Sequence, residues 1–333
     1  MNGWYFFNER NKPIDRILTN TVKSELIELV EYASLSKPSP NQSNYFVRTA
    51  GLTERGIKVK GGNHEKGITD TLSHGEEAVI IAAAEESPND PLKYIVFSGE
   101  HDGIARSCGN CRDSIKERCP DALIANGVKK NRHIHVIDAK RFFFDNFDQF
   151  TESDIKIMPG FNEACYAMRF SRDLFVPPNI DLYGASVVDK NGKVYPGTFF
   201  GTCNYTPTNP IQSAVNNYAA NLSTKNIKQR VPIDHLVIVG LNTKPSPLYK
   251  DRQFFTEIAE DSQALKGKLG TPLPIFLYEA DNNRKPQKMW KTDSYEWMPF
   301  PFSPYHLGME ERILDSASWI EGIKKERANP FKE

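Results

Sequence analysis

Four residues in the first half of the chain have the types and spacing of a metal centre with an adjacent proton-transfer group. The tripeptide His74-Gly75-Glu76 precedes a C-x-x-C motif formed by Cys108 and Cys111. Catalytic zinc sites usually have three protein ligands and leave a fourth position open, and histidine and cysteine are typical zinc ligands. We therefore predict that the histidine and the two cysteines bind Zn2+. Glu76, two residues after His74, is then placed to transfer protons without binding the metal.

A structural zinc site or a redox-active cysteine pair would share part of this pattern. A C-x-x-C motif occurs in both kinds of site, and an H-x-E tripeptide alone is common. A structural zinc site normally needs a fourth protein ligand, for which His64 and His101 are the nearest candidates. Neither has a suitable spacing, so the combined pattern favours a catalytic zinc site.

The composition limits the classes of protein and of partner. The chain has 333 residues, enough for two domains, and its 42 Lys and Arg balance its 42 Asp and Glu. Zero net charge argues against a nucleic-acid partner, because phosphate contacts come mainly from Lys and Arg. No apolar run reaches membrane-span length, and the first residues lack the features of a secretory signal. Five cysteines, an odd number, fit a reducing compartment better than a disulfide framework. We expect a cytoplasmic protein with no membrane contact.

The elements that must position the four residues alternate between helix and strand. Apolar residues recur at helical spacing over 20–35. The remaining pattern predicts strands at 45–50, 56–60, 94–97 and 133–137, and helices that begin near residues 74 and 108. This alternation predicts an α/β layer sandwich with both halves of the metal motif at helix starts.

The second half of the chain repeats this order of elements. The pattern predicts helices at 162–170 and from residue 210, and strands at 181–188, 193–200, 235–239 and 274–278. Superposing the two halves places Pro210-Ile211-Gln212 on His74-Gly75-Glu76, and no cysteine follows Cys203. The second copy is thus expected to lack a metal site. We divide the chain into an N-terminal helical segment, a catalytic zinc domain, a non-catalytic domain and a tail, at 1–43, 44–150, 151–320 and 321–333.

With these motifs the chain resembles the cytidine deaminases, in the two-domain form that has a catalytic first copy and a degenerate second copy. Zinc deaminases have an H-x-E tripeptide followed by P-C-x-x-C, which the metal motif matches apart from Ser107 in place of proline. The resemblance implies two tandem copies of a three-layer α/β/α cytidine deaminase-like fold. It also implies a homodimer and a small nucleoside substrate.

The resemblance assigns further residues to the substrate pocket. Gly62-Asn63-His64-Glu65 is similar to the family's ribose-binding segment, which implies that Asn63 and Glu65 hold the ribose hydroxyls. The segment Tyr45-Phe46-Val47 resembles the family's F-x-V strand, which implies that Tyr45 packs on the base. The family further implies that the Gly75 N–H donates to the base carbonyl.

The C-terminal segment 298–307 resembles the family's L-P-x-x-F-G-P tail, which implies that Phe302 closes over a pocket. The first copy also departs from the family beside this pocket. Arg48-Thr49 replaces a small Gly-Ala pair, and the approach to Cys108 over 98–106 is longer. Arg48 is therefore a candidate for reshaping the substrate entrance or binding a phosphate.

The function implied is zinc-dependent hydrolytic deamination of cytidine or deoxycytidine to the uridine counterpart, with release of ammonia, in pyrimidine salvage. A second interpretation is a deaminase that acts on a base in single-stranded DNA or RNA, on a nucleotide or on a modified nucleoside. The long 98–106 segment and Arg48 motivate it, and the neutral charge disfavours its nucleic-acid version. A third interpretation is a catalytically silent zinc-binding scaffold, against which the intact Glu76 argues.

Overall fold

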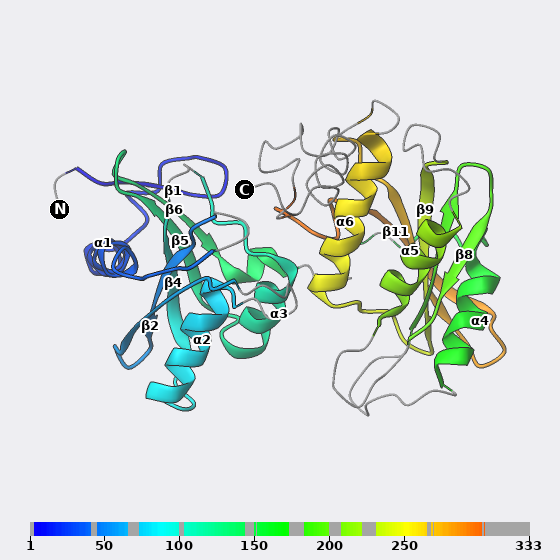
Figure 1. Ribbon diagram of the computed structural model, residues 1–333, viewed down its shortest axis with the longest axis horizontal. Helices are drawn as coiled ribbons and strands as arrows, with labels where there is room; N and C mark the ends of the chain where they lie inside the picture. Colours follow the sequence, from blue (N-terminus) through cyan, green and yellow to red (C-terminus); the bar gives the residue numbers. More distant parts are fainter. Residues whose placement is uncertain are drawn as a thin grey trace, which may run out of the picture. The chain divides into compact units, whose positions relative to one another are not determined.

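The computed structural model divides the chain into two compact units, Met1–Phe144 and Asp145–Glu333 (Figure 1). It describes residues 3–40, 45–65, 73–99, 103–143, 150, 152–172, 183–199, 208–221, 231–264, 268, 270–301 and 303. Among these residues, no helix is both long enough and apolar enough to span a membrane.

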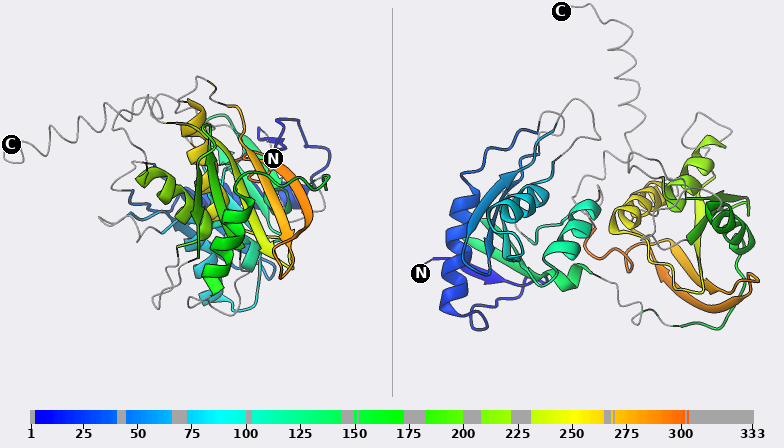
Figure 2. Two further views of the ribbon diagram at one scale, coloured as in Figure 1. Left: turned by 90° about the vertical axis from the view of Figure 1, so that its right-hand side faces the viewer. Right: turned by 90° about the horizontal axis from the view of Figure 1, so that it is seen from below.

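The first unit is a six-stranded sheet with helices on both faces. The strands lie in the order β1-β6-β5-β4-β2-β3. Their bounds are Tyr5–Phe7 for β1, Arg48–Thr53 for β2, Lys58–Gly62 for β3, Leu92–Ser98 for β4, Leu123–Val128 for β5 and His133–Asp138 for β6. The helices are α1 (Asn20–Ala33), α2 (Gly75–Glu86), α3 (Gly109–Arg118) and the short 3-10 helix η2 (Ala139–Phe142). Helix α1 lies on one face of the sheet, and α2 and α3 lie on the other (Figures 1 and 2).

Alternation along β2 explains these layers. Ala50 and Leu52 belong to the core under α1, where Leu26 and Val30 of that helix are fully buried. Thr49, the residue before Ala50, points to the opposite face, because successive side chains of a strand alternate. There the Thr49 hydroxyl lies 2.8 Å from the carbonyl oxygen of Gly75, the first residue of α2. Strand β2 therefore fixes where α2 begins.

The second unit is a five-stranded sheet in the order β11-β10-β9-β7-β8. Its strands are β7 (Tyr183–Asp189), β8 (Val194–Gly197), β9 (Ile233–Leu241), β10 (Pro274–Ala280) and β11 (Pro286–Asp293). Its helices are α4 (Phe161–Arg172), α5 (Pro210–Ala220) and α6 (Tyr249–Ala264). Helix α4 lies on the face opposite to α5 and α6 (Figure 1). The predicted α/β architecture, with helices on both faces of each sheet, is confirmed.

The two units share their strand order, their strand directions and an irregularity. Apart from β1, the five strands of each sheet pair as antiparallel, antiparallel, parallel and antiparallel, read from β3 to β6 and from β8 to β11. The register of β2 shifts between Leu52 and Thr53, and that of β7 shifts between Val188 and Asp189. These pairs occupy the same place in their strands, which aligns the units residue by residue.

This alignment corrects the sequence superposition by one residue. A Cβ on Gly61 would lie 3.1 Å from Val79 N and 3.2 Å from Gly75 O, and a Cβ on Gly197 would approach Ala214 N and Pro210 O. Gly75 therefore corresponds to Pro210. The residue that corresponds to His74 is Asn209 rather than Pro210, since each is the N-cap of its helix. Glu76 consequently corresponds to Ile211.

Candidate metal centre

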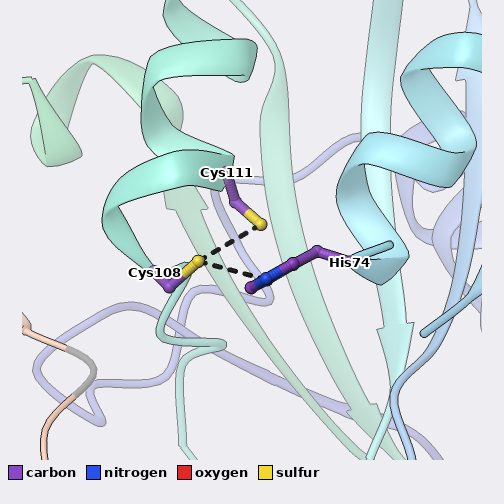
Figure 3. A group of neighbouring side chains, drawn as sticks. All are labelled: His74, Cys108 and Cys111. Atoms are coloured by element: carbon purple, nitrogen blue, oxygen red, sulfur yellow. Dashed lines mark hydrogen bonds between the residues drawn. The ribbon is translucent and has the colours of Figure 1, made fainter. Parts of the chain in front are cut away.

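The two halves of the metal motif come together where α2 and α3 begin. His74 is the N-cap of α2, Cys108 is the N-cap of α3, and Cys111 lies in the first turn of α3. Their side chains point toward one another, as Figure 3 shows, and their ligand atoms all lie within 4.8 Å of each other. Cys108 Sγ is 3.2 Å from His74 Nδ1 and 3.5 Å from Cys111 Sγ.

These distances fit a tetrahedral zinc ion. Zinc–sulfur and zinc–nitrogen bond lengths imply a sulfur–sulfur separation of roughly 3.8 Å and a sulfur–nitrogen separation of roughly 3.6 Å. The observed separations are a few tenths of an ångström shorter, and both thiols are free. His64 is exposed and outside this group, and His101 is outside the described residues. A group of one imidazole and two thiols is the donor set of a catalytic zinc site.

Electrostatic coupling ties the three groups together. Hydrogen bonding with Cys111 and His74 holds the pKa of Cys108 well below its usual range, against the effect of burial. The hydrogen bond with Cys108 raises the pKa of His74 to about 9. Burial, followed by the contact with Cys108, raises the pKa of Cys111 well above its usual value. Because metal ligands must be deprotonated, metal binding here must release protons from the cysteine and the histidine.

Glu76 is the buried carboxyl group beside this cluster. It lies in the first turn of α2 and is 6% exposed. Burial and the charge of Cys108 raise its pKa, while its own backbone N–H, His74 and the Ser107 side chain lower it. A buried carboxyl group whose pKa is raised is the type of group that acid–base catalysis uses.

Asn63 has a structural role that the sequence did not indicate. Its Oδ1 accepts from Val47 N at 2.9 Å, and its Nδ2 donates to Tyr45 O at 2.8 Å. An amide keeps one further donor hydrogen and one further lone pair after two such bonds. Contact with a substrate hydroxyl thus stays a prediction, now for a side chain that also holds the segment from Tyr45 to Val47 in place.

Of the other predicted pocket residues, Gly75 and Val47 lie close together, since a Cβ on Gly75 would lie 2.9 Å from Val47. Tyr45 is exposed, Val47 is half-buried, and the Arg48 guanidinium lies over the Phe46 ring at 5.7 Å. Gly75 follows His74 directly, and Glu65 is half-buried two residues after Asn63. Phe302 lies outside the described residues. The structure thus gathers Tyr45, Val47 and Asn63 by hydrogen bonds.

Arg112 and Thr49 support the site, and neither was predicted to do so. Arg112 follows Cys111 directly and is fully buried; its Nε donates to Ser107 O at 2.8 Å, and its guanidinium lies over the Phe142 ring at 4.7 Å. The Thr49 hydroxyl is within hydrogen-bonding distance of Gly61 O and Gly75 O. An arginine directly after a C-x-x-C motif is a sequence signal that could have indicated the supporting role of Arg112.

The second unit has a different set of side chains at these positions. Arg252 Nε donates to Pro247 O as Arg112 Nε donates to Ser107 O, so Leu248 corresponds to Cys108 and Asp251 to Cys111. Asn209 Nδ2 donates to one carboxylate oxygen of Asp251, and the Tyr183 hydroxyl lies 3.4 Å from the other. A buried hydrogen-bonded cluster thus takes the place of the three ligands.

Similar proteins were found only among solved structures. No protein-family model matches the chain, and no curated protein matches it. The cytidine deaminase of Burkholderia pseudomallei is 24% identical over 38% of this chain and 98% of its own, with a TM-score of 0.32. The cytidine deaminase of Mycobacterium tuberculosis is 20% identical over 38% of this chain and 96% of its own, with a TM-score of 0.30. That of Mycobacterium leprae is also 20% identical, over 38% of this chain and 100% of its own, with a TM-score of 0.29.

Proposed function

We propose that the protein is a zinc-dependent hydrolase that deaminates cytidine or deoxycytidine to uridine or deoxyuridine and releases ammonia. The observation that carries this proposal is the buried carboxyl group of Glu76 beside the group formed by His74, Cys108 and Cys111. One imidazole, two thiols and a separate carboxyl group are the parts that a zinc deaminase needs.

In this proposal His74, Cys108 and Cys111 hold the zinc ion. When bound, zinc supplies Lewis-acid chemistry and lowers the pKa of a water molecule. The start of α3 favours this ligand set, because the positive end of a helix stabilises thiolates.

Glu76 moves the protons of the reaction. It takes a proton from the attacking water and delivers protons to the ring nitrogen and to the leaving amine, so that the net reaction consumes one water and releases one ammonia. Its burial supports this role, because the raised pKa lets the same carboxyl group accept and donate. The helix position of Glu76, two residues after the N-cap His74, keeps it next to the ligands.

The remaining roles concern the nucleoside. Gly75 N–H would donate to the base carbonyl, Tyr45 and Val47 would contact the base, and Asn63 with Glu65 would bind the ribose hydroxyls. The hydrogen bonds from Asn63 to the backbone of Tyr45 and Val47 support a shared pocket wall. Phe302 remains a proposed pocket residue.

The second unit would serve as a non-catalytic partner of the first. Asn209, Leu248 and Asp251 at the ligand positions support this assignment, since an amide and an aliphatic side chain are not zinc ligands. We further propose a homodimer, a cytoplasmic location and a role in pyrimidine salvage.

A nucleotide substrate is the second candidate, and Arg48 favours it. Its guanidinium lies over Phe46, next to the Tyr45–Val47 segment that Asn63 holds. Arginine binds phosphate groups well. Turnover of cytidine monophosphate in preference to cytidine, lost in Arg48→Ala, would support this candidate over the nucleoside.

The test is ultraviolet-monitored deamination of cytidine, deoxycytidine and cytidine monophosphate by the zinc-loaded protein. Glu76→Ala should abolish turnover while the zinc content, measured by mass spectrometry, stays the same. Glu85→Ala is the matched control, because Glu85 is an exposed carboxylate of the same helix. A zinc-loaded wild type that turns over none of these substrates would contradict the proposal and favour a silent scaffold or a polymer substrate.

A further inference from the structure

Thr49 carries a buried hydroxyl group that the strand does not need for its own pairing. The side chain lies on the α2 face of β2 and is fully buried. Its Oγ1 is 2.8 Å from Gly75 O and 3.0 Å from Gly61 O. A hydroxyl group has one hydrogen to donate, and Gly61 is already the β3 residue paired with Thr49. The shorter contact, to Gly75, therefore adds a link between the strand and the start of α2.

The Gly75 carbonyl belongs to the peptide group that joins Gly75 to Glu76. A peptide group is planar and stiff, so a bond that holds its oxygen also fixes the direction in which the Glu76 N–H and Cα leave it. Glu76 is buried in the first turn of α2, two residues after the N-cap His74. One peptide group thus connects the Thr49 hydroxyl to the backbone that carries the carboxyl group.

Two glycines make this contact possible. A Cβ on Gly75 would lie 2.9 Å from the Val47 side chain and 3.0 Å from that of Thr49. A Cβ on Gly61 would lie 2.7 Å from the Cβ of Ala78 on α2. Because glycine has no Cβ, β2, β3 and α2 approach closely enough for a side chain as short as threonine to reach the helix carbonyl.

The second unit has no hydroxyl group at this place. Ala185 pairs with Gly197 across β7 and β8 and corresponds to Thr49. Helix α5 nevertheless packs on these two strands. Ile211 corresponds to Glu76 in the same alignment. The fold therefore does not require the hydroxyl group, which occurs in the unit that has a carboxyl group to orient.

We propose that Thr49 is a positioning residue for proton transfer: its Oγ1–H donates to Gly75 O and fixes the peptide group that carries Glu76. This inference rests on the proposed deaminase function, in which the carboxyl group must reach both the attacking water and the base. A small rotation of the peptide group would leave the carboxyl group in place but misaligned, and proton transfer would slow.

The kinetic test compares Thr49→Val, Thr49→Ser and Thr53→Val in the zinc-loaded full-length protein. Thr49→Val keeps the shape of the side chain but removes the donor, and it should lower kcat about tenfold because the reaction depends on orientation. KM should change less than about twofold, and the zinc content should stay the same. Thr49→Ser should restore most of kcat, since it keeps the hydroxyl group.

Thr53→Val is the matched control. Thr53 is also fully buried on β2, and its Oγ1 accepts from Ile57 N at 3.1 Å, at the turn between β2 and β3. The control loses a comparable bond of the same strand, so its stability should fall while kcat stays the same.

Three kinetic outcomes would overturn the inference. They are an unchanged kcat in Thr49→Val, an equal loss of kcat in Thr53→Val, and loss of zinc from Thr49→Val. Thr49→Ala takes the place of the valine variant if that variant does not fold, since alanine occupies this position in the second unit.

Hydrogen exchange separates this inference from the proposed function. The Ala78 amide donates to His74 O in the first turn of α2, and its exchange rate reports how firmly this turn is held. Thr49→Val should speed exchange over 75–79, whereas Thr53→Val should speed it at Ile57 instead. Unchanged exchange over 75–79 in Thr49→Val would overturn the contact even if the protein is a deaminase. Absence of turnover in the wild type would instead overturn the function and leave the exchange rates to decide the contact.

Discussion

The two units place different chemistry on the same framework. In the first, the starts of two neighbouring helices carry His74, Cys108 and Cys111; in the second, the same positions carry an amide, an aliphatic side chain and a carboxylate. Strand order, strand direction and the β-strand irregularity are the same. The N-caps and first turns of these helices are therefore positions at which the side chains differ between the units while the sheet stays the same.

The framework itself is held by contacts that both units make. Arg112 and Arg252 are each buried, and each donates Nε to the carbonyl five residues earlier. Asp138 Oδ1 accepts from the backbone N–H two residues later, as Asp293 Oδ1 does after β11. The two arginine contacts therefore hold the chain before α3 and before α6 in the same way, without a metal.

In the second unit, a hydrogen bond joins the residues that correspond to His74 and Cys111. A buried carboxylate is costly unless it is paired or hydrogen-bonded, and Asp251 has the Asn209 amide and the Tyr183 hydroxyl beside it. Burial and the charge of Asp251 raise the pKa of Tyr183, so that the phenol stays a donor. The comparison thus predicts that metal binding depends on three side chains alone.

The largest effect is expected from Cys108→Ala, set against Leu248→Ala at the matching N-cap. Cys108→Ala removes one of three ligands, so zinc should be lost and turnover should fall at least ~10³-fold. Leu248→Ala should change neither, because Leu248 is half-exposed in the unit without ligands. Zinc analysis and the deamination assay check both variants. Full zinc content in Cys108→Ala would contradict the assignment of the ligands.

A converse change should create a second metal site. Asn209→His, Leu248→Cys and Asp251→Cys together give the second unit the ligand set of the first, on helix starts of the same arrangement. Zinc content should rise from about one to about two ions per chain. Asn209→His alone is the control and should leave the content at about one. A folded triple variant with unchanged zinc would show that the helix starts of the second unit differ from those of the first.

That His74, Cys108 and Cys111 lie together could be predicted, because residue type and spacing indicate a possible metal site. The strand boundaries could not, and β2 shows why. The sequence pattern predicts a strand over 45–50, whereas β2 begins at Arg48. The residues before it are held by the side chain of Asn63 rather than by strand pairing. A side-chain contact between residues far apart in the sequence leaves no periodic pattern.

Strand β5 was not predicted, for a related reason. It contains Asn126-Gly127, a pair typical of turns. In the structure a Cβ at Gly127 would lie 2.2 Å from a Val30 methyl group of α1, and Asn126 Nδ2 donates to Gly103 O. Tertiary packing therefore requires both residues within the strand. By contrast, Asn209 before Pro210 is a local N-cap signal that could have given the correct superposition.

An intermediate effect is expected from the contact between Thr49 and Gly75. A Cβ at Gly75 would lie 2.9 Å from Val47 and 3.0 Å from the Thr49 side chain. Gly75→Ala should therefore destabilise the protein by about 1–3 kcal/mol, as overpacking does. Thr49→Ala in the same chain should recover part of this loss. In the second unit the sizes of the two residues are reversed. The small Ala185 corresponds to Thr49, and the larger Pro210 corresponds to Gly75.

Chemical denaturation measures this pair of variants. The midpoint of Gly75→Ala should fall, and that of the double variant should lie above it. If Thr49→Ala adds to the loss instead, the two side chains do not compete for the same space.

The smallest expected effect is a loss of stability in acid. It concerns a position at which β9 and β4 carry different residues. His235 on β9 corresponds to Tyr94 on β4 in the alignment of the sheets. Burial lowers the pKa of His235 below 6.5, although its Nε2 hydrogen-bonds to Pro159 O and its Nδ1 lies near Asp234. The unfolded chain then binds a proton that the folded chain does not, so stability is lost as the pH falls below about 6.5.

Thermal unfolding at several pH values between about 7.5 and 5.5 tests this difference. The unfolding midpoint of the wild type should fall over this range, and His235→Gln should reduce the fall because glutamine does not titrate. Tyr94→Phe is the matched control, and it should keep the wild-type dependence since Tyr94 has its pKa raised by burial and stays neutral here. Equal pH dependence in the wild type and His235→Gln would place the acid sensitivity elsewhere. The two units would then differ in metal chemistry but not in their response to protons.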